Sequence, residues 1–474
     1  MSSARKLKSL KQILLIQQNF VFQLAIGIYY VTTLLGITSF VFDRRKAGRQ
    51  QRANYEGGQQ RRLLYPRLRI SSALRWYSLM LLLLTIALTP FATYTLYTQM
   101  YFLSLTKLLS VIGHMRFTIL QGFAVFVMLL NFRTQCRSVR FLNRWLGMQY
   151  TLHELACSLK HMRAVDITRR LQLLDQRSCV LLIAKLLLML LTPAHLCYVA
   201  KGERALHRPA LLASMLINYY CVLVLQMTNV LFSVCAIRVG HYGQQINVLL
   251  RQALEVADER LNGQRPLNCT SRQRVFNLSE VISRLHRLHT RNVLLSRELV
   301  RIYSPMLLTF FFSVFMVCSI QLFVFYFATC TRFGANYSTG GVISSNVLSD
   351  KCSSPNFMGL MQVFALLPDM CVVVFISHLM QSYVADTNVI LAEYAFRLPA
   401  PRGICTSQCC EVQLEAALSE FSLYLRMEQQ QRYNLGQEYA FFMTCGLFAL
   451  ERRLIFEICE TILNYLIILV QYYD

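Results

Sequence analysis

Residues Met306–Phe327 read MLLTFFFSVFMVCSIQLFVFYF, with no Asp, Glu, Lys or Arg among them. A helix rises about 1.5 Å per residue, so this run covers about 33 Å, close to the roughly 30 Å of hydrocarbon in a bilayer. Inside lipid every backbone polar group needs an internal partner, and a helix supplies one. The segment therefore predicts a transmembrane helix.

Similar apolar runs occur along the whole chain. They are residues 76–97, 117–132, 178–198, 209–237, 357–380 and 454–473. The chain of 474 residues is 55% hydrophobic and 15% charged, and its mean hydropathy is +0.40. This composition excludes a water-soluble fold and predicts an all-α membrane protein with seven transmembrane helices.

The basic residues indicate how the chain crosses the membrane. Of the Lys and Arg between the runs, 40 fall on one face and 7 on the other. Positive loops stay in the cytoplasm, so the N-terminus is predicted to be cytoplasmic and the C-terminus extracellular. The net charge of +24 is then explained by attraction to the anionic membrane surface, and no nucleic acid is expected as a partner. This orientation disfavours a G-protein-coupled receptor, whose N-terminus lies outside.

A further apolar stretch, residues 24–42, is predicted to be a helix associated with the membrane rather than a span. Polar residues precede it, and Gly27, Gly36 and Ser39 weaken it as a helix.

Three short motifs resemble the insect gustatory receptor family, which is related to the insect odorant receptors. Near the C-terminus, Tyr465, five apolar residues and Gln471 match the family signature, although Asn464 replaces its Thr and Tyr472 replaces its Phe. Residues 446–448 are similar to the Gly-x-Phe that precedes the family's last span. Residues 35–40 are similar to its Leu-Gly-Leu-x-Pro-Phe.

This resemblance implies a chemosensory receptor that is itself a ligand-gated, non-selective cation channel. It implies four identical or related subunits around a central pore lined by the last helix, with a small-molecule tastant as ligand. The expected location is the plasma membrane of sensory neurons. The sugar-sensing branch has Glu after the signature Tyr, whereas this chain has Leu466, which favours bitter or other nonvolatile compounds.

The last helix carries a polar stripe at helical spacing: Thr461, Asn464, Ile468 and Gln471. Such amides commonly form hydrogen bonds between helices. Repeated around an axis, they would also form polar rings with an apolar ring between them, as a pore requires. The resemblance favours the pore for Gln471. Tyr465 and Tyr472 are expected to pack.

Lys185 and Asp369 are ionisable residues well inside predicted spans, and they lie at similar depths. They are expected either to form a structural ion pair or to provide a polar floor beneath a ligand. The resemblance places the ligand in the outer half of the first six helices. The candidates there mix aromatic and polar groups, although packing is the simpler explanation for each singly: Tyr94, Gln121, His195, Asn218, Tyr219 and Phe364.

An extracellular disulfide and a glycosylation site are also expected, whereas metal, cofactor and catalytic sites are not. Cys330 and Cys352 share an outer segment, where a loop disulfide is expected, and Asn336 begins a glycosylation sequon. No metal site, cofactor site or catalytic motif is evident, so an enzyme is not expected. A membrane transporter is the alternative, although the seven unequal segments show no repeat between halves.

These observations divide the chain into four regions. Residues 1–75 form a cytoplasmic segment, 76–380 a six-helix ligand-binding bundle with cytoplasmic helical extensions, 381–453 a cytoplasmic anchor region, and 454–474 the pore-lining helix.

Overall fold

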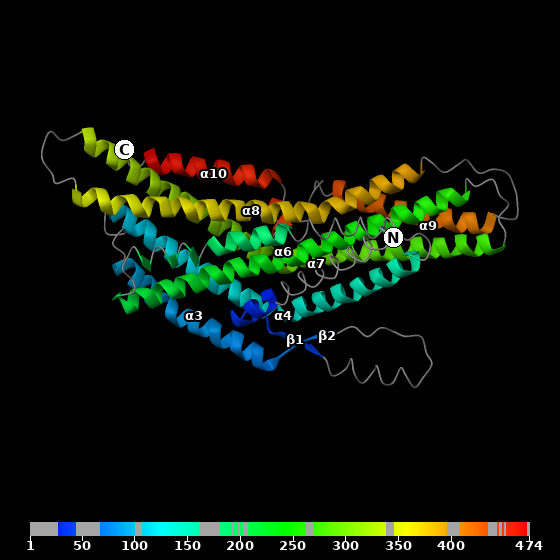
Figure 1. Cartoon of the computed structure of the whole chain (residues 1–474), viewed down its shortest axis with the longest axis horizontal. Coiled ribbons are helices and arrows are strands. Elements are labelled where there is room, and N and C mark those ends of the chain that lie inside the picture. Colours follow the sequence, from blue (N-terminus) through cyan, green and yellow to red (C-terminus); the bar gives the residue numbers. More distant parts are fainter. Residues whose placement is uncertain are drawn as a thin grey trace, which may run out of the picture.

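The fold is nearly all-helical, as predicted, and elongated (Figure 1). The computed structural model describes residues 27–43, 67–99, 107–160, 180–191, 193–194, 196–197, 200–201, 207–261, 269–337, 346–395, 408–434, 443–444, 448–449 and 452–471. Its elements in chain order are β1 (Phe40–Asp43), β2 (Arg67–Ile70), α3 (Ser72–Gln99), α4 (Lys107–Lys160), α6 (Pro209–Leu261), α7 (Cys269–Tyr337), α8 (Asn346–Ala395), α9 (Gln408–Asn434), β3 (Met443–Thr444), β4 (Phe448–Ala449) and α10 (Arg452–Gln471).

Five helices within the described residues are long and apolar enough to cross a membrane. They are parts of α3, α4, α6, α7 and α8. The predicted span 178–198 is represented by a shorter apolar helix, Val180–Leu191. The predicted span 454–473 falls on α10, which has 20 residues.

Four helices continue well past the apolar runs. α4 has 54 residues, α6 has 53, α8 has 50 and α7 has 69. At about 1.5 Å per residue, α7 is about 100 Å long, several times the hydrocarbon thickness. These extensions give the molecule its long axis (Figure 1).

Helix α6 forms the centre of the bundle. It packs against α3, α4, α7 and α8, and 72% of its most apolar stretch is buried, against 33% for α3. Amide side chains join it to its neighbours. Asn131 of α4 donates to Thr228 Oγ1 at 3.1 Å, Asn247 donates to the α8 backbone at 2.8 Å, and Asn292 of α7 donates to the α6 backbone at 3.1 Å.

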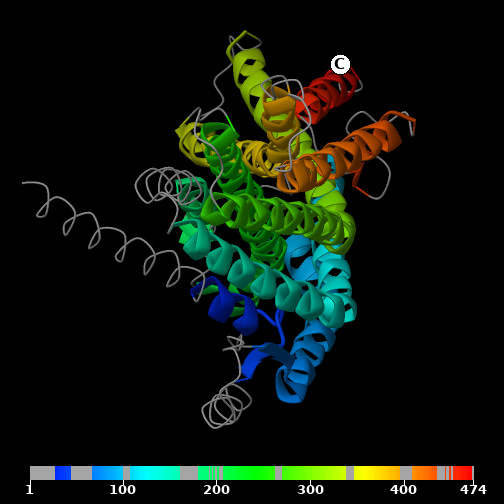
Figure 2. The same cartoon turned by 90° about the vertical axis from the view of Figure 1, so that its right-hand side faces the viewer.

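Helix α9 is held on α7 by aromatic rings. The His286 ring stacks on Phe421 with centroids 4.8 Å apart, and the His289 ring meets Phe421 edge-on at 5.5 Å. Figure 2, which looks along the long axis, shows α9 and α10 on one side of the α6 and α7 core and the N-terminal strands on the other.

The N-terminal segment corrects two predictions. Residues 27–34 are helical, but the chain then turns at Gly36, whose φ is +74°, and enters β1. The expected helix over 24–42 is therefore confirmed over 27–34 and wrong beyond it, because the chain turns at a left-handed glycine. β1 pairs antiparallel with β2, and Asn143 of α4 bonds to both backbone groups of Leu68 at 2.8 and 3.0 Å. With the small β3–β4 pair, the fold is not wholly α-helical.

The predicted outer loop at 328–356 also differs. α7 continues to Tyr337 and α8 begins at Asn346, so most of this segment is helical. The hydropathy that marks the lipid boundary does not mark the end of a helix, which continues in water where no breaker stops it.

Close packing of α6 on α8 at Gly243 gives a test of the fold. A Cβ on Gly243 would lie 2.2 Å from the ring of the buried Tyr383, so Gly243→Ala forces the two helices apart. We expect the yield of folded protein on fluorescence-detected size exclusion to fall sharply. Gly122→Ala, where nothing lies within 4 Å, is the matched control and should be neutral. Equal yields for the two variants would contradict this packing.

The charge-based orientation predicts which segments antibodies reach. An epitope tag after Asp474 should be stained on intact cells, whereas a tag inserted within 262–268 should be stained only after permeabilisation. The reverse pattern would refute the orientation.

Candidate pore and ligand sites

The last helix, α10, lies at the edge of the bundle and is packed on one side only. It contacts α7 and α8, with Leu454 and Ile462 buried. The Tyr465 ring meets Phe315 of α7 edge-on, with centroids 5.8 Å apart. The signature tyrosine therefore fastens α10 to α7, while Tyr472 lies outside the described residues. Views along and across the long axis place α10 opposite α3 (Figures 1 and 2).

The predicted polar stripe is exposed along α10. All four members are exposed in the single subunit, Ile468 by 51%: Thr461, Asn464, Ile468 and Gln471. Thr461 donates to the backbone carbonyl of Glu457 at 2.6 Å. Within the described part of the chain, no hydrogen bond engages the amides of Asn464 or Gln471. The stripe is thus available to neighbouring molecules.

Near the start of α10, Arg453 pairs with Glu457 across one helical turn at 2.9 Å. Both side chains are exposed, so this pair contributes little to stability.

The structure brings Lys185 and Asp369 into direct contact. The Lys185 ammonium donates to Asp369 Oδ1, and the side chains are only 1% and 8% exposed. The ammonium also lies 5.5 Å from the centroid of the Phe310 ring. The pair therefore joins the 180–191 helix, α8 and α7. Each charge would be costly to bury without the other.

The described members of the predicted ligand set differ in exposure. Gln121 is fully buried and accepts a hydrogen bond from Thr93 at 2.6 Å. Tyr94 and Phe364 are 68% and 67% exposed on the outer surface of the subunit. Asn218 and Tyr219 are half-buried on α6, and His195 lies outside the described residues.

Asn218 has one feature that suits a ligand contact. Its Oδ1 is buried, and no described residue donates to it.

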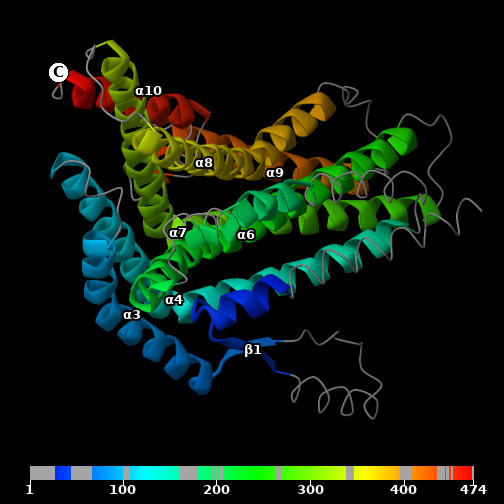
Figure 3. The ribbon, with the colours of Figure 1, turned by 60° about the vertical axis from the view of Figure 1, so that its left-hand side comes forward.

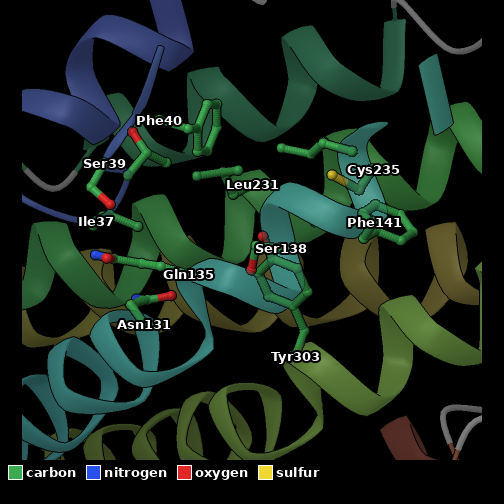
Figure 4. A pocket seen from close by; sticks show the side chains of 12 residues that line it. Ile37, Ser39, Phe40, Asn131, Gln135, Ser138, Phe141, Leu231, Cys235 and Tyr303 are labelled. Atoms are coloured by element: carbon green, nitrogen blue, oxygen red, sulfur yellow. The ribbon is translucent and has the colours of Figure 1, made fainter. Parts of the chain in front are cut away.

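A cavity of about 30 Å³ lies between the N-terminal segment and the bundle (Figure 4). Its polar lining includes Gln135, whose two amide atoms are buried without a described partner, and the equally unpartnered Ser39 hydroxyl. The lining residues are Ile37, Thr38, Ser39, Phe40, Asn131, Gln135, Ser138, Phe141, Leu142, Leu231, Cys235 and Tyr303. This space suits water rather than an organic molecule.

A second cavity of about 10 Å³ shares Tyr303 with the first and reaches Thr228, Asn229 and Phe310. None of the six predicted ligand residues lines either cavity.

One charged cluster was missed by the sequence analysis. Arg116 of α4 donates to Gln362 Oε1 of α8 at 2.6 Å, and the Gln321 amide of α7 lies 2.9 Å from the same oxygen. If the Gln321 amide is rotated by 180°, its oxygen accepts a hydrogen bond from Arg116 Nη2, also at 2.9 Å. No acidic side chain among the described residues pairs with Arg116. Its position directly before the 117–132 run is the signal that could have marked it.

For the predicted disulfide and glycosylation site, the structure describes the backbone alone. Cys330, Asn336 and Cys352 fall on helical backbone, but their side chains lie outside the described residues. The described residues contain no group of His, Cys, Asp and Glu that could hold a metal ion.

The family model described as 7tm Chemosensory receptor matches residues 26–474. The chain belongs to this receptor family. It is 23% identical to the putative gustatory receptor 77a of Drosophila melanogaster over 420 residues, which cover 86% of this chain and 85% of that one. The receptor is thus a relative of insect gustatory receptors, as the motifs predicted.

Solved structures show the same fold. The insect olfactory receptor OR5 from Machilis hrabei superposes with a TM-score of 0.53, covering 96% of this receptor and 99% of OR5 at 9% identity. The complex of OR5 with eugenol gives a TM-score of 0.50, with 95% and 98% covered at 9% identity.

The buried ion pair generates a prediction that separates its two interpretations. Lys185→Met alone leaves Asp369 buried without its partner, so the receptor should lose about 3 kcal/mol or more of stability and much of its surface expression. The double variant Lys185→Met with Asp369→Leu removes both charges and should restore surface expression, measured by antibody staining.

Ligand response of the double variant then decides the role. A retained response means a structural pair, whereas restored expression without response means that the charges contact the ligand. Failure of the double variant to restore expression would contradict the pairing.

Proposed function

We propose that the receptor is a ligand-gated, non-selective cation channel, opened by a bitter or other nonvolatile small molecule. Four identical or related subunits would each contribute α10 to a central pore. The observation that carries this proposal is the exposed stripe on α10. A polar face on an apolar helix is unfavourable against lipid, and it is accounted for if the stripes of several subunits face one another around water.

The order of polar and apolar side chains along the stripe suits a pore that conducts cations. Gln471 and Asn464 would supply rings of neutral amides, which replace part of the hydration of an ion without strong preference among cations. Ile468 lies between them and would form an apolar ring that closes by dewetting. The carbonyl-bonded Thr461 lies nearer the cytoplasm.

The ligand is proposed to bind in the outward half of the six-helix bundle. Support comes from Asn218, whose buried carbonyl oxygen has no described donor and could accept a hydrogen bond from a small amphipathic molecule. Tyr219 on α6 and Gln121 on α4 are further proposed contacts. Leu466, in place of the Glu of the sugar-sensing branch, supports a nonsugar ligand.

The proposed setting is the plasma membrane of sensory neurons. An enzyme is not proposed, since the family consists of chemosensory receptors.

The test is whole-cell current in cells expressing the receptor, with a panel of bitter and sweet compounds. Gln471→Glu would place several carboxylates around the pore, so the permeability of calcium relative to sodium should rise several-fold. Leu463→Glu is the matched control, because Leu463 is also exposed on α10 but faces away from the stripe, and it should leave ion selectivity unchanged.

Ligand-evoked current with unaltered selectivity in Gln471→Glu would contradict the pore assignment. Ligand uptake without current would contradict a channel and favour the alternative, a transporter.

A further inference from the structure

One exposed face of α4 is apolar within the predicted 117–132 span and basic directly after it, at the end predicted to be cytoplasmic. Phe126 and Leu129 are 46% and 48% exposed, and Arg133, Arg137 and Arg140 follow them, all exposed. The spacing of three, four, four and three residues places all five on one side of the helix. An apolar stripe thus continues directly into a basic stripe.

The position of this change matches the boundary of the hydrocarbon. Arg133 is the first residue after the predicted 117–132 span, and Arg140 lies about 10 Å further along the axis. The headgroup layer is about 5 to 8 Å thick on each side of the bilayer, and long Arg side chains reach back toward it. All three guanidinium groups can therefore lie at headgroup level.

The start of α3 adds a fourth cation beside this stripe. The Arg75 guanidinium lies 5.2 Å from the ring centroid of Phe132, the residue next to Arg133. Trp76 is 63% exposed at the same end of α3, as is typical of an aromatic residue at a membrane interface. Figure 3 shows the beginning of α3 and the β1 strand beside α4.

These cations are not neutralised by the described part of the protein. Further along α4, Arg144 pairs with Glu298 of α7 at 2.7 Å. No described acidic side chain forms an ion pair with Arg133, Arg137 or Arg140. Several uncompensated guanidinium groups within two helical turns match a ligand that carries several phosphates, because each group can bind a phosphate through two N–H donors.

We propose that Arg133, Arg137 and Arg140 of α4, with Arg75 of α3, bind the polyphosphorylated headgroup of an inner-leaflet phospholipid. Continuity with Phe126 and Leu129 argues for a lipid rather than a soluble polyanion, since acyl chains would cover the apolar half of the same face. This site is independent of the proposed channel activity. Clusters of basic residues next to a span are known to bind such lipids.

The experiment uses the purified full-length receptor in a nonionic detergent. Binding of short-chain phosphatidylinositol bisphosphate is measured by fluorescence anisotropy, with inositol trisphosphate as the soluble headgroup. The triple variant R133Q/R137Q/R140Q should bind the lipid about tenfold more weakly or worse. The control R284Q/R287Q/R291Q removes the same charge from exposed positions on α7, about 22 Å or more from its span, and should bind as the wild type does. Size exclusion checks that both variants are folded, and the single variant Arg137→Gln gives an intermediate step.

Three outcomes would overturn the proposal. They are unchanged lipid affinity in the α4 variant, an equal loss in both triple variants, which would mean diffuse charge attraction, and soluble headgroup binding as tight as that of the lipid.

Discussion

Inside a bilayer, a polar group has no water to bind, and this constraint shapes the bundle around α6. The hydrophobic effect does not press helices together in lipid, so packing and hydrogen bonds between helices must do so. Within the predicted spans, the Asn131 amide of α4 joins Thr228 of α6 in this way. The ion pair between Lys185 and Asp369 gives each of two buried charges a partner in the same way. The result is a core whose polar groups hold it in one arrangement.

The last helix is the exception to this arrangement. α10 rests on α7 and α8 through Leu454, Ile462 and Tyr465, and its remaining faces have no partner within the described chain. The bundle around α6 is thus enclosed by its own chain, whereas α10 is left open on most of its surface.

The sequence predicts depth in the membrane better than direction around a helix. Five of the seven apolar runs fall on helices long enough to cross a membrane, and Lys185 and Asp369, predicted at similar depths, are in contact. Among the ligand candidates, Gln121 is buried and Tyr94 is exposed, and hydropathy does not say which way a side chain faces.

Long-range contacts were also beyond the sequence. The β1–β2 pair joins segments separated by a long stretch of chain, and the Arg116 cluster depends on amides from α7 and α8. The cavity at Gln135 exists because the segment after Gly36 folds back on the bundle. Such features arise from tertiary structure, which local patterns do not encode.

Helix α7 has a mechanical consequence. Its 69 residues form one continuous helix, which packs on α9 through His286 and His289 and meets Tyr465 of α10 along its apolar run. Pro305 lies inside α7, directly before the predicted 306–327 span. It lacks the backbone N–H that would donate to the carbonyl one helical turn earlier. Bending costs least there. Helix α7 is therefore expected to bend most easily at Pro305, between the part that packs on α9 and the part that meets α10.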